Sequence, residues 1–309
     1  MTYEIFAEEI CRGVKEALNE THTVKLMNTM KLNDTRKVQL LIEKTHPEEG
    51  IYAEPSMGLD EFYDLYLAGK PLDVCVQEVL RFYQEAEERA EAESWYKAIH
   101  IWEQAKQRVY PILLCQSKNK ELLQDLIWRP FLDLAVCYAV VFPTKNGQGT
   151  MKIRKSHLSM WGIDEEELHR KAEENNQKQG YSLMSIDTAI RQILTGKDPV
   201  SQKTMKDTGM YVLTNDLRDY GATKMLCSEY LKEISAGRSF YIIPSSVHEL
   251  ILLGEMPEQD QCIEELNQMI QEVNRDMVAE EEVLSDHVYF YNRTSNIYNL
   301  NPENIFFFC

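Results

Sequence analysis

The side chains with the types needed for covalent chemistry gather in the last quarter of the sequence. Ser246 and His248 stand close together after the apolar run 240–244, and Asp286 precedes a second apolar run at 288–291. A serine hydroxyl becomes a nucleophile when a neighbouring imidazole takes its proton and a carboxylate orients that imidazole. If the two runs form neighbouring strands, Ser246 would act as nucleophile, His248 as base and Asp286 as the orienting acid of a hydrolase-like enzyme.

Two further residues could take the catalytic roles, and a purely structural interpretation is also open. Ser245 is a second candidate nucleophile, and Glu249 is a second candidate for the orienting acid. No G-x-S-x-G motif, which marks the nucleophile of the α/β-hydrolases, occurs in the sequence. Pro244 before the two serines instead favours a β-turn whose hydroxyls bind local backbone groups. We prefer the turn interpretation for this reason.

The same segments contain ligand types that suit zinc or another divalent metal. These residues are His248, Glu249, Asp286 and His287. Adjacent residues of a strand point to opposite faces, so each neighbouring pair offers one ligand to a common site. The second histidine of an H-E-x-x-H motif is missing. We therefore expect no metal, and because G-x-G-x-x-G and G-K-[ST] motifs are also missing, we expect no nucleotide cofactor.

A carboxylate interrupts the most apolar run of the chain. Asp133 lies within residues 131–142, which are otherwise apolar and are predicted to form a strand. Burying an unpaired carboxylate is costly, so Asp133 needs a partner. Arg129 is the nearest candidate. Buried carboxylates with shifted pKa values also occur at functional sites.

The composition excludes several classes of partner. The 309 residues include 33 basic and 50 acidic side chains, for a formal net charge of −17. Such a field repels phosphate backbones and anionic membranes, so we expect neither nucleic acid nor a membrane as a partner. The first residues lack the basic and apolar regions of a secretory signal. Seven scattered cysteines without a C-x-x-C pair indicate reduced thiols, which predicts a cytoplasmic location.

Hydrophobic periodicity predicts an α+β fold with mixed, mostly antiparallel sheets and packed helices, divided into two lobes. Residues 1–105 are expected to form an N-terminal lobe that begins with a helix. A hairpin with its turn at Asn33 and Asp34 follows, then a third strand at 51–54 and further helices.

Residues 106–309 are expected to form the larger α+β domain. Asp164, with an acidic residue three positions later, has the pattern of a helix N-cap. Two apolar runs at 240–244 and 250–253 predict a strand hairpin. The polar segment 175–209 is expected to be the most variable part of this domain.

Five segments carry a resemblance to a known family: 131–136, 156–163, 210–215, 243–249 and 283–289. They resemble the signature segments of an uncharacterised bacterial domain-of-unknown-function family, found mainly in anaerobic gut bacteria. The resemblance covers nearly the whole chain, although segments 175–209 and 303–309 depart from it. The order of elements over 210–253 is also similar to a second uncharacterised, bacillus-type family. The resemblance implies a bacterial, cytoplasmic α+β protein, and it implies no reaction, cofactor or site residue.

Two functions remain open on the sequence. The first is a soluble interaction or accessory protein without catalytic activity, which binds another protein through an exposed sheet face or the aromatic residues 305–308. Its first hundred residues share the element order of small acidic chaperone folds, which is an analogy of fold alone. The alternative is the hydrolase-like enzyme that uses Ser246 or Ser245, His248 and Asp286. We favour the first because no catalytic spacing rises above chance.

Overall fold

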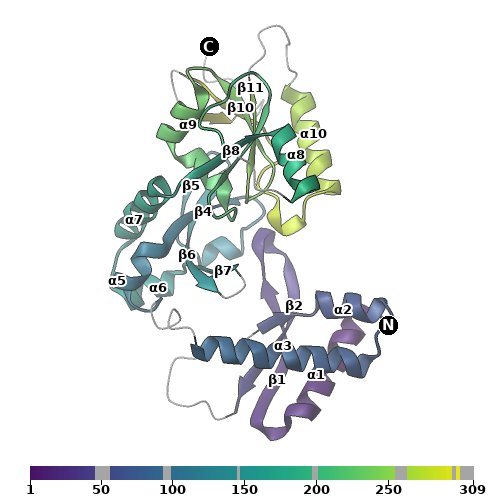
Figure 1. Cartoon of the computed structure of the whole chain (residues 1–309). Coiled ribbons are helices and arrows are strands. Elements are labelled where there is room, and N and C mark those ends of the chain that lie inside the picture. The colour runs from purple at the N-terminus through teal and green to yellow at the C-terminus, as the bar shows by residue number, and fades with distance from the viewer. Residues whose placement is uncertain are drawn as a thin grey trace. The chain divides into compact units, whose positions relative to one another are not determined.

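The computed structural model has an α+β fold with mostly antiparallel sheets, which confirms the predicted class (Figure 1). The chain divides into two compact units. Unit 1 consists of Met1–Lys31, Thr35–Gln104 and Phe142–Gly149, and unit 2 consists of Leu32–Asp34, Ala105–Val141 and Thr150–Cys309. No helix in the described ranges is long and apolar enough to cross a membrane. The residues described are 1–45, 56–92, 99–144, 147–196, 201–254, 263–293 and 297–299.

Unit 1 packs helices on a three-stranded antiparallel sheet of order β1-β2-β3. Phe6, Ile10 and Val14 recur every four residues on the first helix and are buried against the sheet and the third helix. The elements are α1 (Tyr3–Leu18), β1 (His22–Met30), β2 (Arg36–Lys44), β3 (Ser56–Gly58), α2 (Asp60–Leu67) and α3 (Leu72–Ala92).

The predicted turn of the first hairpin is confirmed. Asn33 and Asp34 have φ angles of 57° and 49°, a left-handed conformation that Asn and Asp tolerate better than most residues. The register that results pairs Val24 with Ile42, and both side chains are buried in the core of unit 1. The strand predicted at 51–54 lies outside the described residues, and β3 is the third strand of this sheet.

The first sheet of unit 2 has the order β4-β6-β5, with β7 paired to β6. The sequence analysis predicted that Asp133 lies inside a strand, and this prediction was wrong. Leu132 and Asp133 form a two-residue turn in which Phe131 pairs with Leu134, and Leu132 takes a φ of 55°. The strands are β4 (Val109–Cys115), β5 (Trp128–Phe131), β6 (Leu134–Thr144) and β7 (Gly147–Lys152), and the short helix α5 (Trp102–Ala105) precedes them.

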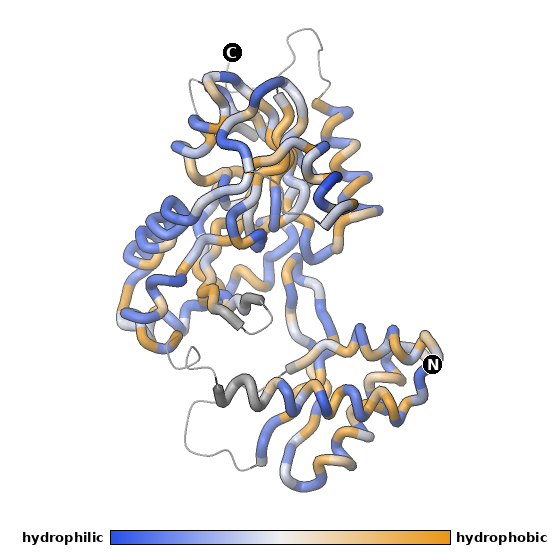
Figure 2. The backbone as a smooth tube through the Cα atoms, viewed as in Figure 1, coloured by the Kyte–Doolittle hydropathy of each residue, from blue (hydrophilic) through white to orange (hydrophobic). Residues whose placement is uncertain are grey.

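Helix α7 (Glu165–Lys178) packs on β4, after the shorter α6 (Lys155–Trp161). Its predicted cap is confirmed, since the Asp164 carboxylate accepts the backbone N–H of Glu167 at 2.8 Å. Figure 2 shows this helix as mostly hydrophilic, so apolar burial alone does not hold it. The buried Asn175 amide donates to the backbone oxygen of Val109 at 2.8 Å and so fastens the helix to β4.

A buried lysine holds the C-terminal end of α7. Lys224 lies in the 3-10 segment Gly221–Leu226, and its Nζ donates to the backbone oxygens of Asn176 and Gln179 at 2.8 and 2.9 Å. The last carbonyls of a helix lack intrahelical partners, so a cation there is favourable. Burial lowers the pKa of Lys224 to about 8, so the ammonium retains its proton at neutral pH.

The second sheet of unit 2 is six-stranded, with the order β13-β12-β10-β11-β9-β8. All its pairings are antiparallel. The predicted hairpin is confirmed, since Ile243 of β10 pairs with Ile251 of β11. The strands are β8 (Tyr181–Ser185), β9 (Met210–Asn215), β10 (Phe240–Pro244), β11 (Leu250–Gly254), β12 (Tyr289–Tyr291) and β13 (Ile297–Asn299).

Helices cover this sheet on both sides. Figure 1 shows α9 (Ser228–Ser235) and α10 (Ile263–Asp276) on opposite sides of it. Ile270 of α10 packs in one cluster with Ile243 and Ile251. The segment 175–209, expected to be variable, contains β8 and α8 (Ile186–Thr195), and α8 packs on β8 and β9.

Candidate functional site

The carboxylate of Asp133 is the centre of a partly buried polar cluster in unit 2. It accepts hydrogen bonds from Tyr289 Oη at 2.9 Å and Ser285 Oγ at 2.9 Å, and His287 Nδ1 lies 3.2 Å from it. Desolvation opposes ionisation of Asp133, but these three donors outweigh it and hold the pKa of the carboxyl below its usual value. Asp133 is therefore an ionised, fully partnered structural anion.

The partner predicted for Asp133 was wrong. Arg129 forms an ion pair with Glu166 of α7 instead. Arg129 lies in β5, three residues before the turn, so its side chain projects from a sheet face, whereas Asp133 lies in the turn itself. Arg129 and Asp133 are therefore close in sequence but do not form an ion pair.

His248 lies in a second polar cluster, against two acids. Its Nδ1 is 3.1 Å from Asp219 Oδ1, and its Nε2 is 3.7 Å from Glu282 Oε1. The hydrogen bond to Asp219 is the main reason that the pKa of His248 is raised above its ordinary value, although burial opposes the shift. The acid that orients the His248 ring is therefore Asp219, a residue that sequence reasoning missed.

The predicted nucleophile lies in a turn. The Ser246 hydroxyl accepts the backbone N–H of His248 at 3.0 Å, and the Ser246 N–H donates to the Glu249 carbonyl at 3.3 Å. Ser285 makes the same contact with the N–H of His287, at 3.1 Å. Ser246 thus forms the local side-chain turn that the Pro-Ser-Ser pattern had suggested, and Ser285 forms a similar turn that was not predicted.

The remaining predicted site residues have other surroundings. Asp286 contacts Lys118 Nζ at 3.2 Å and Asn274 Nδ2 at 2.8 Å. Ser245 and Glu249 are half-buried in the β10–β11 connection. Among the described residues, no group of three or more His, Cys, Asp or Glu side chains is arranged to hold a metal ion.

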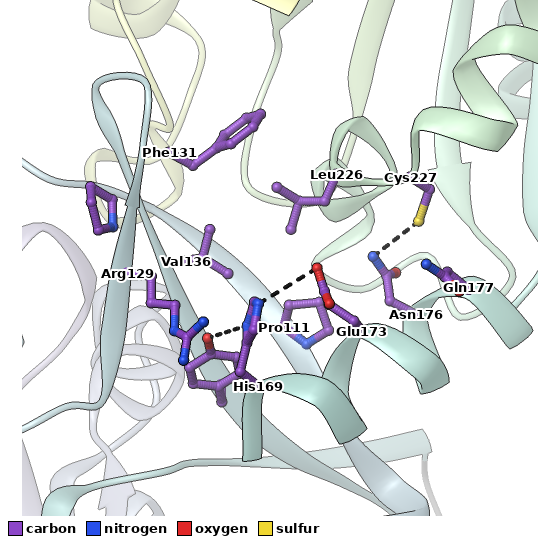
Figure 3. Close-up of a pocket in the computed structure, with 12 residues that line it drawn as sticks. Pro111, Arg129, Phe131, Val136, His169, Glu173, Asn176, Gln177, Leu226 and Cys227 are labelled. Atoms are coloured by element: carbon purple, nitrogen blue, oxygen red, sulfur yellow. Dashed lines mark hydrogen bonds and ion pairs between the residues drawn. The ribbon is translucent and has the colours of Figure 1, made fainter. Parts of the chain in front are cut away.

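A pocket of about 270 Å³ lies in unit 2, between the four-stranded sheet and α7. Figure 3 shows Arg129 and Val136 on the sheet side, His169 and Glu173 on the helix, and Leu226 closing the far wall. No motif in the sequence marked this site. The lining residues are Pro111, Arg129, Pro130, Phe131, Val136, Tyr138, His169, Glu173, Asn176, Gln177, Leu226 and Cys227.

The polar groups of the pocket are linked in a chain. Tyr138 Oη lies 2.8 Å from His169 Nδ1, and His169 Nε2 lies 3.6 Å from Glu173 Oε1 (Figure 3). Burial raises the pKa of Tyr138 well above its ordinary value, although the positive charge of Arg129 opposes the rise. Tyr138 therefore stays a neutral phenol, and its O–H can donate to the imidazole when Nε2 carries the ring proton.

A thiol and an amide lie at the other end of the lining. Asn176 Nδ2 donates to the Cys227 sulfur at 3.2 Å (Figure 3). Desolvation raises the pKa of Cys227, although Lys224 opposes the rise. A thiol of this kind is protonated at neutral pH and is a poor nucleophile.

Comparison with known families places the chain in one of them. Residues 3–293 match the model described as "Family of unknown function (DUF5688)". The match spans nearly the whole chain, so the chain belongs to this family, and the predicted full-length resemblance to a domain-of-unknown-function family is confirmed. No curated protein and no solved structure matches the chain. Membership transfers no residue role, because the family has no assigned function.

The Asp133 cluster predicts a selective loss of stability. Asp133→Asn removes the negative charge and one of the two acceptor oxygens, so Ser285 and His287 lose their common partner. We expect the free energy of unfolding at pH 7 to fall by about 2–3 kcal/mol, as for lost hydrogen bonds to a charged group. Urea denaturation measures the change. Asp125→Asn, which breaks a half-exposed ion pair with Arg154, should cost less than about 1 kcal/mol. Equal losses in the two variants would contradict the anchoring role.

The raised pKa of His248 predicts a pH-dependent contribution to stability. A raised folded pKa stabilises the fold below the unfolded value of 6.5, and the contribution disappears as pH rises through the folded value. The stability advantage of the native chain over His248→Gln should therefore be larger at pH 5.5 than at pH 8.5, in urea denaturation. In a chain that carries Asp219→Asn the pH dependence should shrink, because the main cause of the shift is removed. An advantage that does not vary with pH refutes the ionic role.

Proposed function

We propose that this member of a family without an assigned function is a non-catalytic accessory protein that acts by binding, in the cytoplasm of a bacterium. Its unit 2 pocket would take a small molecule. The observation that carries this proposal is the state of the pocket's own reactive groups. Tyr138 and Cys227 both have raised pKa values, which is the opposite of what an activated nucleophile needs. The lining is therefore suited to holding a ligand rather than attacking it.

The polar clusters outside the pocket support the same proposal. The hydroxyls of Ser246 and Ser285 are each used by a backbone N–H of their own turn. The His248 imidazole is held by acids from other segments. Such contacts fix loops to the sheets. Serine, histidine and acidic side chains thus have a structural role here, although in another arrangement they perform acyl transfer.

The cytoplasmic part of the proposal rests on the cysteines. Within the described ranges Cys11, Cys75, Cys115, Cys137 and Cys227 are free thiols. Disulfides form and persist in oxidising compartments, whereas free buried thiols are usual in a reducing one. The resemblance to a bacterial family is consistent with this location.

Fragment binding tests the proposed function. A library of small fluorinated fragments is screened by ¹⁹F NMR against the native chain and against Leu226→Trp, in which an indole fills part of the pocket. We expect hits on the native chain that the variant loses, with an unchanged thermal unfolding curve as evidence that the variant folds. Leu65→Trp, at an exposed position in unit 1, is the matched control and should keep every hit. Hits that persist in Leu226→Trp, or no hits at all, would argue against a binding pocket.

An esterase assay of the native chain and of serine variants tests the hydrolase alternative. Hydrolysis of p-nitrophenyl esters by the native chain that Ser246→Ala abolishes would show catalysis by Ser246, with His248 and Asp286 or Asp219 as its partners. Activity is expected to be absent in both proteins, because the Ser246 hydroxyl is engaged in its turn. Ser245→Ala covers the second candidate nucleophile.

A protein partner is a second candidate function, favoured by the exposed face of α10. Met269 and Val273 of α10 and Met277, just past its end, recur every four residues and are 43%, 41% and 82% exposed. Ile270 and Asn274, each about 100° further round the helix, are buried. Methionine-rich exposed faces suit helical partners, since the flexible thioether adapts its packing. The predicted aromatic surface at 305–308 lies outside the described residues.

Acidic residues beside this face of α10 indicate that its partner is positively charged. Glu265 and Glu272 lie one helical turn from Met269 and are exposed, so they share its side of α10. An apolar stripe with an acidic margin complements a basic amphipathic helix of another protein. We propose that helix as the occupant.

A capture experiment from the native host tests this surface. The native chain and a variant with Met269→Gln, Val273→Gln and Met277→Gln are each used as bait, and Leu67→Gln, at a position 62% exposed in unit 1, is the control. We expect a basic helical protein with the native chain and the control, and its loss with the triple variant. Recovery that does not depend on these three residues excludes this surface.

A further inference from the structure

We infer that the unit 2 pocket selects a small organic acid with one carboxylate and an apolar body. This inference rests on the proposed binding function and adds the chemical class of the ligand. It depends on the charge at one end of the pocket, the apolar walls at the other, and the volume between them. The side chains that give the pocket this charge, these walls and this volume come from separate parts of the sequence.

Arg129 provides the positive charge at the polar end. It is the single Arg or Lys among the described lining residues, and in Figure 3 its side chain extends toward His169. Its ion pair is with Glu166, whose side chain is 79% exposed. A guanidinium has five N–H donors in a planar fork, so a single carboxylate does not saturate it. Glu166 can return to water at little cost when a ligand carboxylate takes its place.

Neutral donors complete the polar end. Tyr138 is held protonated by burial and lies on the same sheet face as Arg129. Its contact with His169 fixes the direction of the imidazole. When His169 Nδ1 carries the ring proton, it donates to Tyr138 Oη and leaves the phenol O–H free. That O–H and the guanidinium then match the two oxygens of a carboxylate, because hydrogen bonds to an ionised acceptor are stronger than those between neutral groups.

The neighbouring acids limit the charge of the ligand. Glu166 and Glu173 both lie at the polar end, and the chain as a whole carries a net charge of −17. A dianionic phosphate would meet twice the repulsion of a monocarboxylate from the same two acids. Since two carboxylates already surround the one guanidinium, each further negative charge on a ligand is repelled, and a monoanion is favoured over a dianion.

The walls and the volume limit the rest of the molecule. Pro111, Phe131, Val136 and Leu226 give the body of the ligand an apolar environment. The pocket volume of about 270 Å³ falls just below the range of about 300–1,000 Å³ that is typical for drug-sized ligands. An aromatic or short branched acid fits within this volume, whereas a nucleotide or a long acyl chain would have to extend out of the pocket.

Calorimetric titration of the full chain with benzoate tests the inference. Benzamide is the neutral match of the same shape, and phenyl phosphate is the dianionic one. We expect benzoate to bind at least about tenfold more tightly than either, as one charge-assisted hydrogen bond allows. Thermal unfolding curves of each variant below establish that it folds.

Three variants separate the charge from the cavity. Arg129→Gln should weaken benzoate binding by about 10- to 100-fold and leave benzamide unchanged. Arg129→Lys, which keeps the charge without the planar fork, should give an intermediate loss. Glu166→Gln removes the competing carboxylate, so it should strengthen benzoate binding about two- to fivefold.

The outcomes distinguish this inference from the proposed function. Equal affinity for benzoate and benzamide, lost in Leu226→Trp, would overturn the carboxylate class while the binding pocket stands. Tighter binding of phenyl phosphate would overturn the limit to a single charge. No binding of any of the three probes, together with no fragment hits, would overturn the proposed function itself.

Discussion

The hydrogen bonds to the Asp133 carboxylate link the two sheets of unit 2, next to the strands that carry the pocket. The carboxylate lies at the turn of one sheet, and its donors lie on β12 of the other sheet and just before it. A carboxylate removed from water requires donors, and three donors on one segment make its ionised form favourable. The turn itself requires a positive φ at Leu132. The strands on either side of this turn carry Arg129 and Val136, so the anchor also fixes the floor of the pocket.

A short serine–x–histidine pattern occurs twice in unit 2 and has the same structural role each time. In Ser246–His248 and in Ser285–His287 the hydroxyl accepts the N–H two residues later, and the imidazole reaches an acid from a distant segment. Each turn is thereby closed locally and fastened to the rest of the unit at a second point. The residue types of acyl transfer are present, but each hydroxyl accepts a backbone N–H of its own turn, and that of Ser285 also donates to Asp133. Residue type alone therefore does not distinguish a loop anchor from a catalytic centre.

The pocket combines groups that are reactive elsewhere with an environment that keeps them unreactive. Desolvation keeps the Tyr138 phenol and the Cys227 thiol protonated, and the buried Lys224 ammonium is engaged by helix carbonyls. Arg129 retains its charge because guanidinium is not deprotonated in proteins. What remains is a small pocket with apolar walls and one persistent cation at its end, which supports the proposed binding function.

The sequence by itself determined the elements whose signals are local. The Asn33–Asp34 turn, the Asp164 cap and the 240–253 hairpin follow from backbone preferences of a few adjacent residues, and the structure confirms each. The α+β class and the family resemblance were also available from the chain. Within the segment 175–209, β8 and α8 were not predicted, because the segment as a whole is polar and only a few of its side chains are buried.

Only the tertiary structure decided which polar residues meet. Asp219 reaches His248 and Asp133 reaches Ser285 and His287 across long stretches of chain, whereas Arg129, the neighbour in sequence, pairs with Glu166. The pocket is assembled from β4, β5, β6, α7 and the segment before α9, and none of them carries a motif. Local sequence fixes backbone conformation, but the partner of a buried charge is set by whichever donors the packed sheets bring within hydrogen-bonding distance.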